Sequence, residues 1–245
     1  MRVRSVQVHD RPVERAEAGQ RVAVALPGVE RRELRRGDAL VTPDAFAGSY
    51  RLDVALDADD ELPPRVHVHH GTADVVGRVA RVGERFAQLR LAEPVVAARG
   101  DRVVLRAGTT VGGGTILDPA PPRHADAARL ELLEWGEPAA TVHAPVREDE
   151  LRRLGDEALA GLERAGGWAF SPAWLDELRA ELERRLEAAD PLDPGIPPPP
   201  EPWAAAVEPL VGLERRGAKL YRPGAAAELG ARGEAAASSA AAPGR

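Results

Sequence analysis

Three histidines are the side chains whose types and spacing come nearest to a chemical site. His67, His69 and His70 fall in a short segment with β-strand character, and residues two apart on a strand point to the same side. The imidazoles of His67 and His69 could therefore reach one metal ion, but no carboxylate or thiolate ligand follows at a matching spacing. The pattern favours histidines that hydrogen-bond within a barrel or contact RNA over a metal site.

A glycine run is the second candidate for chemistry, because the amides of Gly112, Gly113 and Gly114 could cradle a phosphate. The run stands between strand-like segments and lacks the helix and lysine that follow a phosphate loop, so it predicts a tight turn. The sequence also has no motif for nucleotide hydrolysis, dinucleotide binding, zinc proteolysis or serine hydrolysis. We therefore expect no catalytic residue, no cofactor and no enzyme activity in this chain.

The composition excludes several further classes of protein. The chain has 245 residues, 44% of them hydrophobic, which is enough to bury a core. It has no apolar run of membrane-spanning length and no secretory signal, so we expect a cytoplasmic protein without a membrane partner. Cysteine is absent, which excludes disulfides and thiolate metal sites.

The charge is unevenly distributed, although the net charge of −6 argues against a nucleic-acid partner at first sight. Residues 1–118 hold 18 arginines against 17 acidic residues, and residues 119–245 therefore carry −7. Residues 65–106 are more polarised, with eight arginines and four acidic residues. This segment can present a basic face, or simply a solvated surface.

The first half of the chain alternates apolar and polar residues with the period of β-strands. Residues 20–26 are an example, with Val22, Val24 and Leu26 on one side of the predicted strand. Residues 1–42 supply three or four strands, too few to close, and predict a partial barrel. Residues 43–118 predict a complete antiparallel barrel. Its expected strands are residues 49–56, 64–70, 74–82, 85–93, 102–106 and 115–117.

The second half changes to a helical pattern, which predicts an α-rich, winged-helix half. Residues 119–189 predict one winged-helix domain, with short helices over 147–154 and 156–164, a core of Trp168, Phe170 and Trp174, and a helix capped by Ser171. Residues 190–230 predict a proline-rich connector and a partial second winged helix. We expect residues 231–245 to be a disordered tail, since they lack an apolar pattern.

Several of these segments, in the same order, resemble the selenocysteine-specific elongation factor family. Residues 3–23 followed by 36–38 are similar to the second half of its domain two, and residues 67–73, 86–91 and 100–119 to its domain three. Residues 166–174 and 213–224 resemble its first winged-helix repeats. The resemblance implies a protein that carries selenocysteyl-tRNA to the ribosome. In the family, GTP and magnesium bind a GTPase domain, and terminal winged helices hold the messenger selenocysteine insertion hairpin; this chain contains neither part.

The resemblance also implies roles for individual residues. Arg21 corresponds to an arginine that holds the selenocysteyl group, whose selenol is an anion at neutral pH and suits a permanently charged guanidinium. The third domain would meet the tRNA backbone, where guanidinium and amide groups position phosphates without reading sequence. The residues implied in tRNA binding are Arg102, Arg106, Thr109, Thr110, Gly112 and Gly113.

Two alternatives remain open at this point. Residues 125–225 could form a winged-helix module that binds nucleic acid or protein while the barrels only support it, although the acidic charge of residues 119–245 disfavours duplex DNA. The sequence could also be a gene fragment without a function. Arg102 could pair with a surface carboxylate instead of a phosphate.

Overall fold

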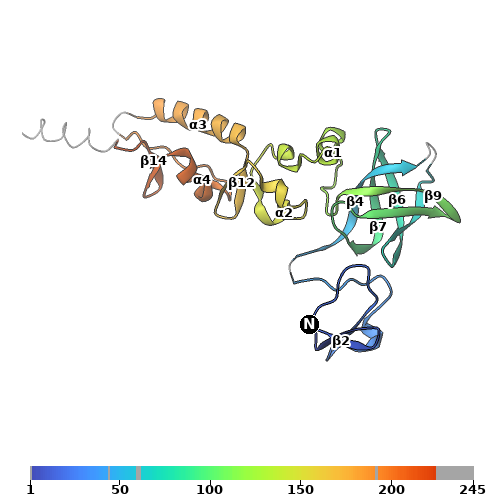
Figure 1. Ribbon diagram of the computed structural model, residues 1–245. Coiled ribbons are helices and arrows are strands. Elements are labelled where there is room, and N and C mark those ends of the chain that lie inside the picture. The colour runs from blue at the N-terminus through green and yellow to red at the C-terminus, as the bar shows by residue number, and fades with distance from the viewer. Residues whose placement is uncertain (1, 44, 59–61, 191–192, 225–245) are drawn as a thin grey trace, which may run out of the picture.

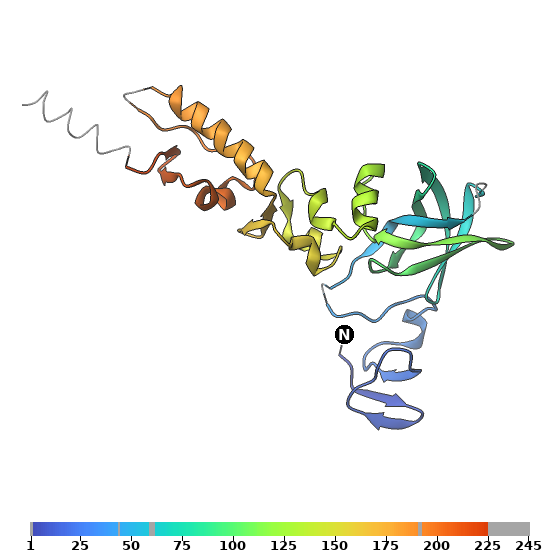
Figure 2. The same ribbon diagram turned by 45° about the horizontal axis from the view of Figure 1, so that its top comes forward.

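The structure is a computed structural model that describes residues 2–43, 45–58, 62–190 and 193–224 (Figure 1). The described chain has three parts: a small N-terminal sheet, a β-barrel, and a series of helices with short hairpins. Figures 1 and 2 agree that the helical part extends from the barrel in one direction and the N-terminal sheet in another. The expected tail at 231–245 lies outside the described residues.

The N-terminal part is a three-stranded antiparallel sheet in the order β2-β1-β3. Its strands are β1 (Ser5–Val8), β2 (Arg11–Val13) and β3 (Val22–Ala25), and a 3-10 helix, η1 (Arg31–Glu33), follows. His9 and Asp10 form the β1–β2 turn with positive φ angles of 50° and 60°. Val24 is exposed, so this sheet has little apolar core of its own among the described residues.

The second part is a closed barrel of six strands in the order β4-β7-β6-β5-β8-β9. Side chains of alternate residues point inward and fill it, among them Leu52, Val68, Leu89 and Leu105, all fully buried. The mostly β first half and the closure expected from the sequence are confirmed. The strands are β4 (Gly48–Ala58), β5 (Arg65–His70), β6 (Ala73–Val82), β7 (Phe86–Val96), β8 (Arg102–Ala107) and β9 (Thr109–Asp118).

The tight turn expected at residues 112–114 is wrong, because these residues belong to strand β9. The turn lies at Gly108, with φ 77°, and β9 runs between β4 and β8 and pairs with both. The neighbouring strands come so close that a Cβ at Gly113 would lie 2.7 Å from the Val103 carbonyl oxygen. A Cβ at Gly114 would lie 2.4 Å from the carbonyl oxygen of Ala55. The glycines therefore allow close strand packing.

The first helical unit follows the barrel directly. Asp126 caps the first helix by accepting a hydrogen bond from the amide of Ala128. Leu130, Leu133, Leu154 and other apolar side chains form its core and also cover Phe86 and Leu117 of the barrel. The elements are α1 (Ala127–Glu134), η2 (Pro138–Thr141), β10 (Val146–Arg147), α2 (Glu148–Arg152), η3 (Asp156–Leu159), β11 (Glu163–Ala165) and β12 (Trp168–Phe170).

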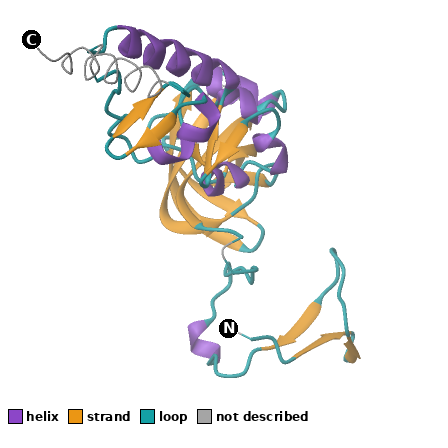
Figure 3. Cartoon of the chain, turned by 90° about the vertical axis from the view of Figure 1, so that its left-hand side faces the viewer, coloured by secondary structure: helices purple, strands orange, loops and turns teal. Residues whose placement is uncertain are grey.

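A second unit contains α3 (Pro172–Glu187), α4 (Ala204–Val211) and the hairpin of β13 (Glu214–Arg216) and β14 (Lys219–Tyr221). Ser171 caps α3 as expected, accepting from the amide of Trp174. Leu182 and Leu186 of α3 pack against Ile196 and Leu220. The domain boundary expected at residue 189 therefore cuts through this unit. With 16 residues, α3 is the longest helix in the described part of the chain, and it runs across the top of Figure 3.

The expectation of an α-rich half is too strong, since the four α-helices of the described residues alternate with short strands and 3-10 turns. Residues 156–164 are not one helix: η3 ends at Leu159, and Gly161 with φ 73° redirects the chain into β11. Phe170 is fully buried, as expected of a core aromatic. No helix in the described part is long and apolar enough to cross a membrane.

Candidate nucleic-acid interface

The histidines and arginines singled out in the sequence meet on one outer face of the barrel. His67 of β5 pairs in register with Arg106 of β8, and His69 pairs with Val104. Arg102 lies two residues before Val104 on β8, and its side chain therefore points to the same side of the strand. We call His67, His69, Arg102 and Arg106 the β5–β8 face. Its members lie outward because the residues between them, Val68 and Leu105 included, fill the barrel core.

A carboxylate from the neighbouring strand organises the histidines of this face. The Nδ1 atom of His67 lies 2.8 Å from Oδ1 of Asp74 on β6, and Nε2 of His69 lies 3.8 Å from the same oxygen. The hydrogen bond from His67 holds the pKa of Asp74 below its usual value. His70 turns away and pairs with Asp101, Nε2 to Oδ2, at 2.9 Å. The sequence did not point to Asp74, which strand pairing alone brings here.

Both histidines of the β5–β8 face lie against the carboxylate of Asp74. His67 and His69 stack with their ring centroids 6.5 Å apart, and both face the same carboxylate oxygen. No group of three or more ligating side chains placed to hold a metal ion occurs within the described residues. The imidazoles are thus held in position for contacts at the surface.

The remaining residues implied in tRNA binding divide into two groups. Arg102 lies 3.8 Å from Asp57, Nη2 to Oδ2, and both side chains are largely exposed, so this ion pair is weak. Thr109 and Thr110 are exposed at the start of β9, beside Arg106. Gly112 and Gly113 lie inside the sheet, where each is paired with both neighbouring strands. Their amides are consequently part of the sheet and form no phosphate cradle.

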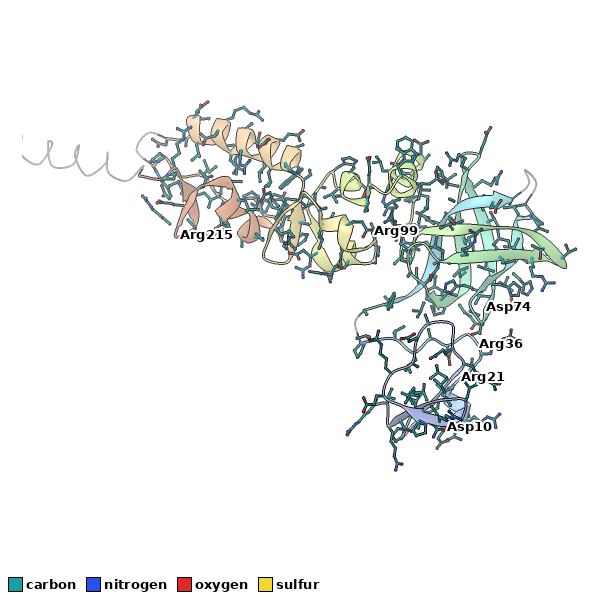
Figure 4. All side chains as sticks on the ribbon, viewed as in Figure 1. Asp10, Arg21, Arg36, Asp74, Arg99 and Arg215 are labelled. Atoms are coloured by element: carbon teal, nitrogen blue, oxygen red, sulfur yellow. The ribbon has the colours of Figure 1, made fainter. Side chains whose placement is uncertain are left out.

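Arg21 lies directly before β3 and is exposed, and its side chain has no hydrogen-bond or ion-pair partner among the residues that the structure describes. The turn that contains Arg36 and Gly37 connects the N-terminal sheet to the barrel: a Cβ at Gly37 would lie 3.1 Å from the Cα atom of Ala73. Arg21, Arg36 and Asp74 follow one another from the sheet to the barrel (Figure 4).

The described residues do not fit the triphosphate of GTP. A phosphate loop requires free backbone amides at the start of a helix, with a lysine to follow. The glycine run instead lies in a paired strand, and Lys219, the one lysine of the chain, is bonded to Asp193. The site can offer guanidinium and imidazole groups to an anion, but no phosphate cradle.

Comparison with known proteins defines the class first. Residues 49–123 match the family model described as the beta-barrel domain of the selenocysteine-specific elongation factor. The barrel is thus that of a translation elongation factor. A curated selenocysteine-specific elongation factor of Escherichia coli strain K12 is 31% identical over 195 residues. That of Desulfomicrobium baculatum is 33% identical over 135 residues. The chain belongs to the selenocysteine-specific elongation factor family, which confirms the resemblance noted in the sequence.

The chain spans less than a third of the length of these relatives. The matches cover 76% of the chain and 30% of the Escherichia coli protein, and 48% of the chain and 21% of the Desulfomicrobium protein. The structure also matches the crystal structure of a bacterial selenocysteine-specific elongation factor with a TM-score of 0.68. This match covers 91% of the chain and 42% of the crystallised protein. At 18% identity this last likeness concerns the fold.

Proposed function

We propose that this chain supplies the selenocysteyl-tRNA contacts of a selenocysteine-specific elongation factor and performs no catalysis itself. The observation that carries the proposal is the β5–β8 face, which lies within the segment matched to the family's barrel domain. GTP and magnesium would bind a domain outside this sequence. The partners would be selenocysteyl-tRNA and the ribosome, in the cytoplasm, where translation takes place.

The proposed division of labour follows from charge and position. Arg102 and Arg106 would contact phosphates of the tRNA stem, with Thr109 and Thr110 beside them to reach 2′-hydroxyls. These contacts would position the tRNA without reading its sequence. Arg21 would supply selectivity, since a selenolate anion gains a charge-assisted hydrogen bond from a guanidinium and a serine hydroxyl does not.

Replacement of Arg21 tests the selectivity. We expect Arg21→Gln to lower affinity for selenocysteyl-tRNA about tenfold, the size of one charge-assisted hydrogen bond, and to leave affinity for the same tRNA carrying serine unchanged. Fluorescence anisotropy with labelled tRNA measures both. Arg15→Gln removes the same charge from a neighbouring exposed site and is the matched control. Equal losses with both aminoacyl groups would contradict the role of Arg21.

Replacement of the barrel arginines tests the tRNA surface. In R102Q/R106Q, affinity for both aminoacyl forms should fall together, and the slope of log affinity against log salt should decrease by about 2, one for each phosphate contact. The control is R123Q/R164Q, which removes two exposed arginines outside the barrel. Wild-type affinity and slope in R102Q/R106Q would refute the proposed surface.

A second candidate function places binding in the helical part. The two units share the order helix, short extended segment, helix, hairpin, since Ile196 pairs with Leu220 in the second unit much as β10 pairs with β12 in the first. That order is typical of winged-helix proteins, which bind nucleic acids or other proteins. Loss of RNA binding in R123Q/R164Q, with R102Q/R106Q unaffected, would favour this function.

A further inference from the structure

Four arginines form an unbroken row across neighbouring strands of the barrel. Arg65 of β5 pairs in register with Arg78 of β6, Arg78 pairs with Arg90 of β7, and Arg90 pairs with Arg51 of β4. Each points outward, because an adjacent residue on its strand faces the barrel core. We call these four residues the arginine row.

No ion pair joins the four guanidinium groups to a carboxylate among the described residues, and the charge of Arg51 acts only at longer range on the buried Asp53, where it counteracts part of the rise in pKa. Nε of Arg90 donates to Gln88 Oε1 at 3.2 Å, and Nε of Arg51 donates to the carbonyl oxygen of Pro121 at 3.5 Å. Arginines of the helical part behave differently, as shown by Arg184 with Glu181 and Arg222 with Glu183. Like charges directly opposite on neighbouring strands repel each other, so the row is an arrangement that an external anion would stabilise.

The row begins beside the β5–β8 face, because Arg65 lies two residues before His67 on β5, and it runs away from that face to Arg90 on β7 and Arg51 on β4. In the closed order β4-β7-β6-β5-β8-β9, strand β7 lies three strands from β8 in either direction. Arg90 on β7 therefore lies on the opposite side of the barrel from Arg102 and Arg106. A rigid RNA stem that contacts β8 cannot also lie along β7.

The shape of the row indicates the kind of anion. Neighbouring strands are about 4.8 Å apart, so the four positions span about 14 Å in a line on a convex surface. A small anion needs donors that converge in a hollow, whereas a line of guanidinium groups suits a polymer with regularly repeated phosphates. At one end, Pro63 and Pro64 with Arg65 and Arg78 line a shallow hollow of about 450 Å³. Its apolar proline surface beside guanidinium groups suits a ribose next to its phosphate.

We infer that the arginine row is a second RNA-binding surface, which holds the phosphate backbone of an RNA duplex independently of the tRNA surface proposed above. Contact would be through phosphates and 2′-hydroxyls and would not depend on base sequence. The factor could then hold a second RNA segment along β6, β7 and β4, away from β8.

The test uses the full chain with the double variant R78Q/R90Q and a labelled RNA duplex of arbitrary sequence. Anisotropy titrations over a range of salt should show affinity reduced by about tenfold at low salt and a salt slope reduced by about 2. R123Q/R164Q is the control for loss of charge and should bind as wild type does. Duplex binding should persist in R102Q/R106Q, since that variant leaves the arginine row intact.

Three results would overturn the inference. The first is that R78Q/R90Q binds the duplex as tightly as the wild type does. The tRNA proposal would still stand in that case if R102Q/R106Q had lost affinity for tRNA. The second is loss of duplex binding in R102Q/R106Q alone, which would mean a single RNA surface. The third is a fall of several degrees in the melting temperature of R78Q/R90Q, since removing mutual repulsion should leave it unchanged or higher.

Discussion

Asp53 is a buried carboxyl whose pKa is raised by its environment. Its side chain is fully buried under the segment that leaves the barrel, where Gln88 Nε2 donates to Oδ1 at 3.0 Å. Arg129 Nη1 lies 3.7 Å from Oδ2, and Asp118 is buried nearby. Burial raises the pKa of Asp53 to about 6, since the hydrogen bond from Gln88 and the charge of Arg129 offset only part of the lost hydration.

This shift predicts a pH dependence of stability. A carboxyl whose pKa is raised by folding favours the folded state when protonated, and the benefit is lost as the pH rises through about 6. Asp53→Asn imitates the protonated form. As the pH rises from about 4 to about 7, the free energy of unfolding of this variant should increase relative to that of the wild type, by about 3 kcal/mol at most. Urea unfolding followed by circular dichroism measures the gain.

Asp57→Asn is the companion variant for that experiment, because it removes an exposed carboxylate from the same strand. A difference between Asp53→Asn and wild type that stays constant over the whole pH range would show that Asp53 does not titrate as its environment implies.

At the scale of elements, strand β9 depends on residues without side chains. Gly114 faces the Ala55 carbonyl so closely that any Cβ would push β9 away from β4. Gly108, at the β8–β9 turn, has open space around its missing Cβ and needs glycine only for its φ of 77°. An added side chain would therefore cause a steric clash at Gly114, whereas at Gly108 it would cost only backbone strain.

Substitution by alanine should reveal this difference. Gly114→Ala is expected to destabilise the barrel by about 3 kcal/mol, the upper range for overpacking, and Gly108→Ala by about 1 kcal/mol, the cost of a left-handed conformation for a residue with a side chain. Chemical denaturation of the two variants and the wild type gives the values. Equal losses would show that β9 can move away from β4 without cost.

At the scale of the whole molecule, polar contacts of Arg99 and Asp118 connect the barrel with the first helical unit, and we call this interface the polar joint. The guanidinium group of Arg99, in the loop after β7, donates to the carbonyl oxygens of Leu133 and Leu154 at 2.6 Å and 3.2 Å, and to Glu157 at 2.6 Å (Figure 4). Asp118 at the end of β9 pairs with Arg129 and Arg153 of the helical unit. These contacts supplement the apolar core shared by the two parts.

Arg99→Ala should loosen this joint without unfolding either part. The expected result is about tenfold faster proteolysis of the segment 119–126, because the lost hydrogen bonds of a charged group contribute about 1.4 kcal/mol or more. The four tryptophans, at positions 135, 168, 174 and 203, report unfolding of the helical part separately. Arg102→Ala is the control, since Arg102 makes one weak ion pair far from the joint. Unchanged proteolysis in Arg99→Ala would exclude Arg99 from the joint.

The sequence by itself determined the mostly β barrel, the cap at Ser171 and the family, because strand alternation, capping and linear motifs are local patterns that neighbouring residues specify. Only the tertiary structure decided that Asp74 joins the histidines, that Gly112 and Gly113 lie within the sheet, and that Arg51, Arg65, Arg78 and Arg90 form one row. These facts depend on strand order and register. Both are fixed when distant strands bury a common core, and no local pattern encodes them.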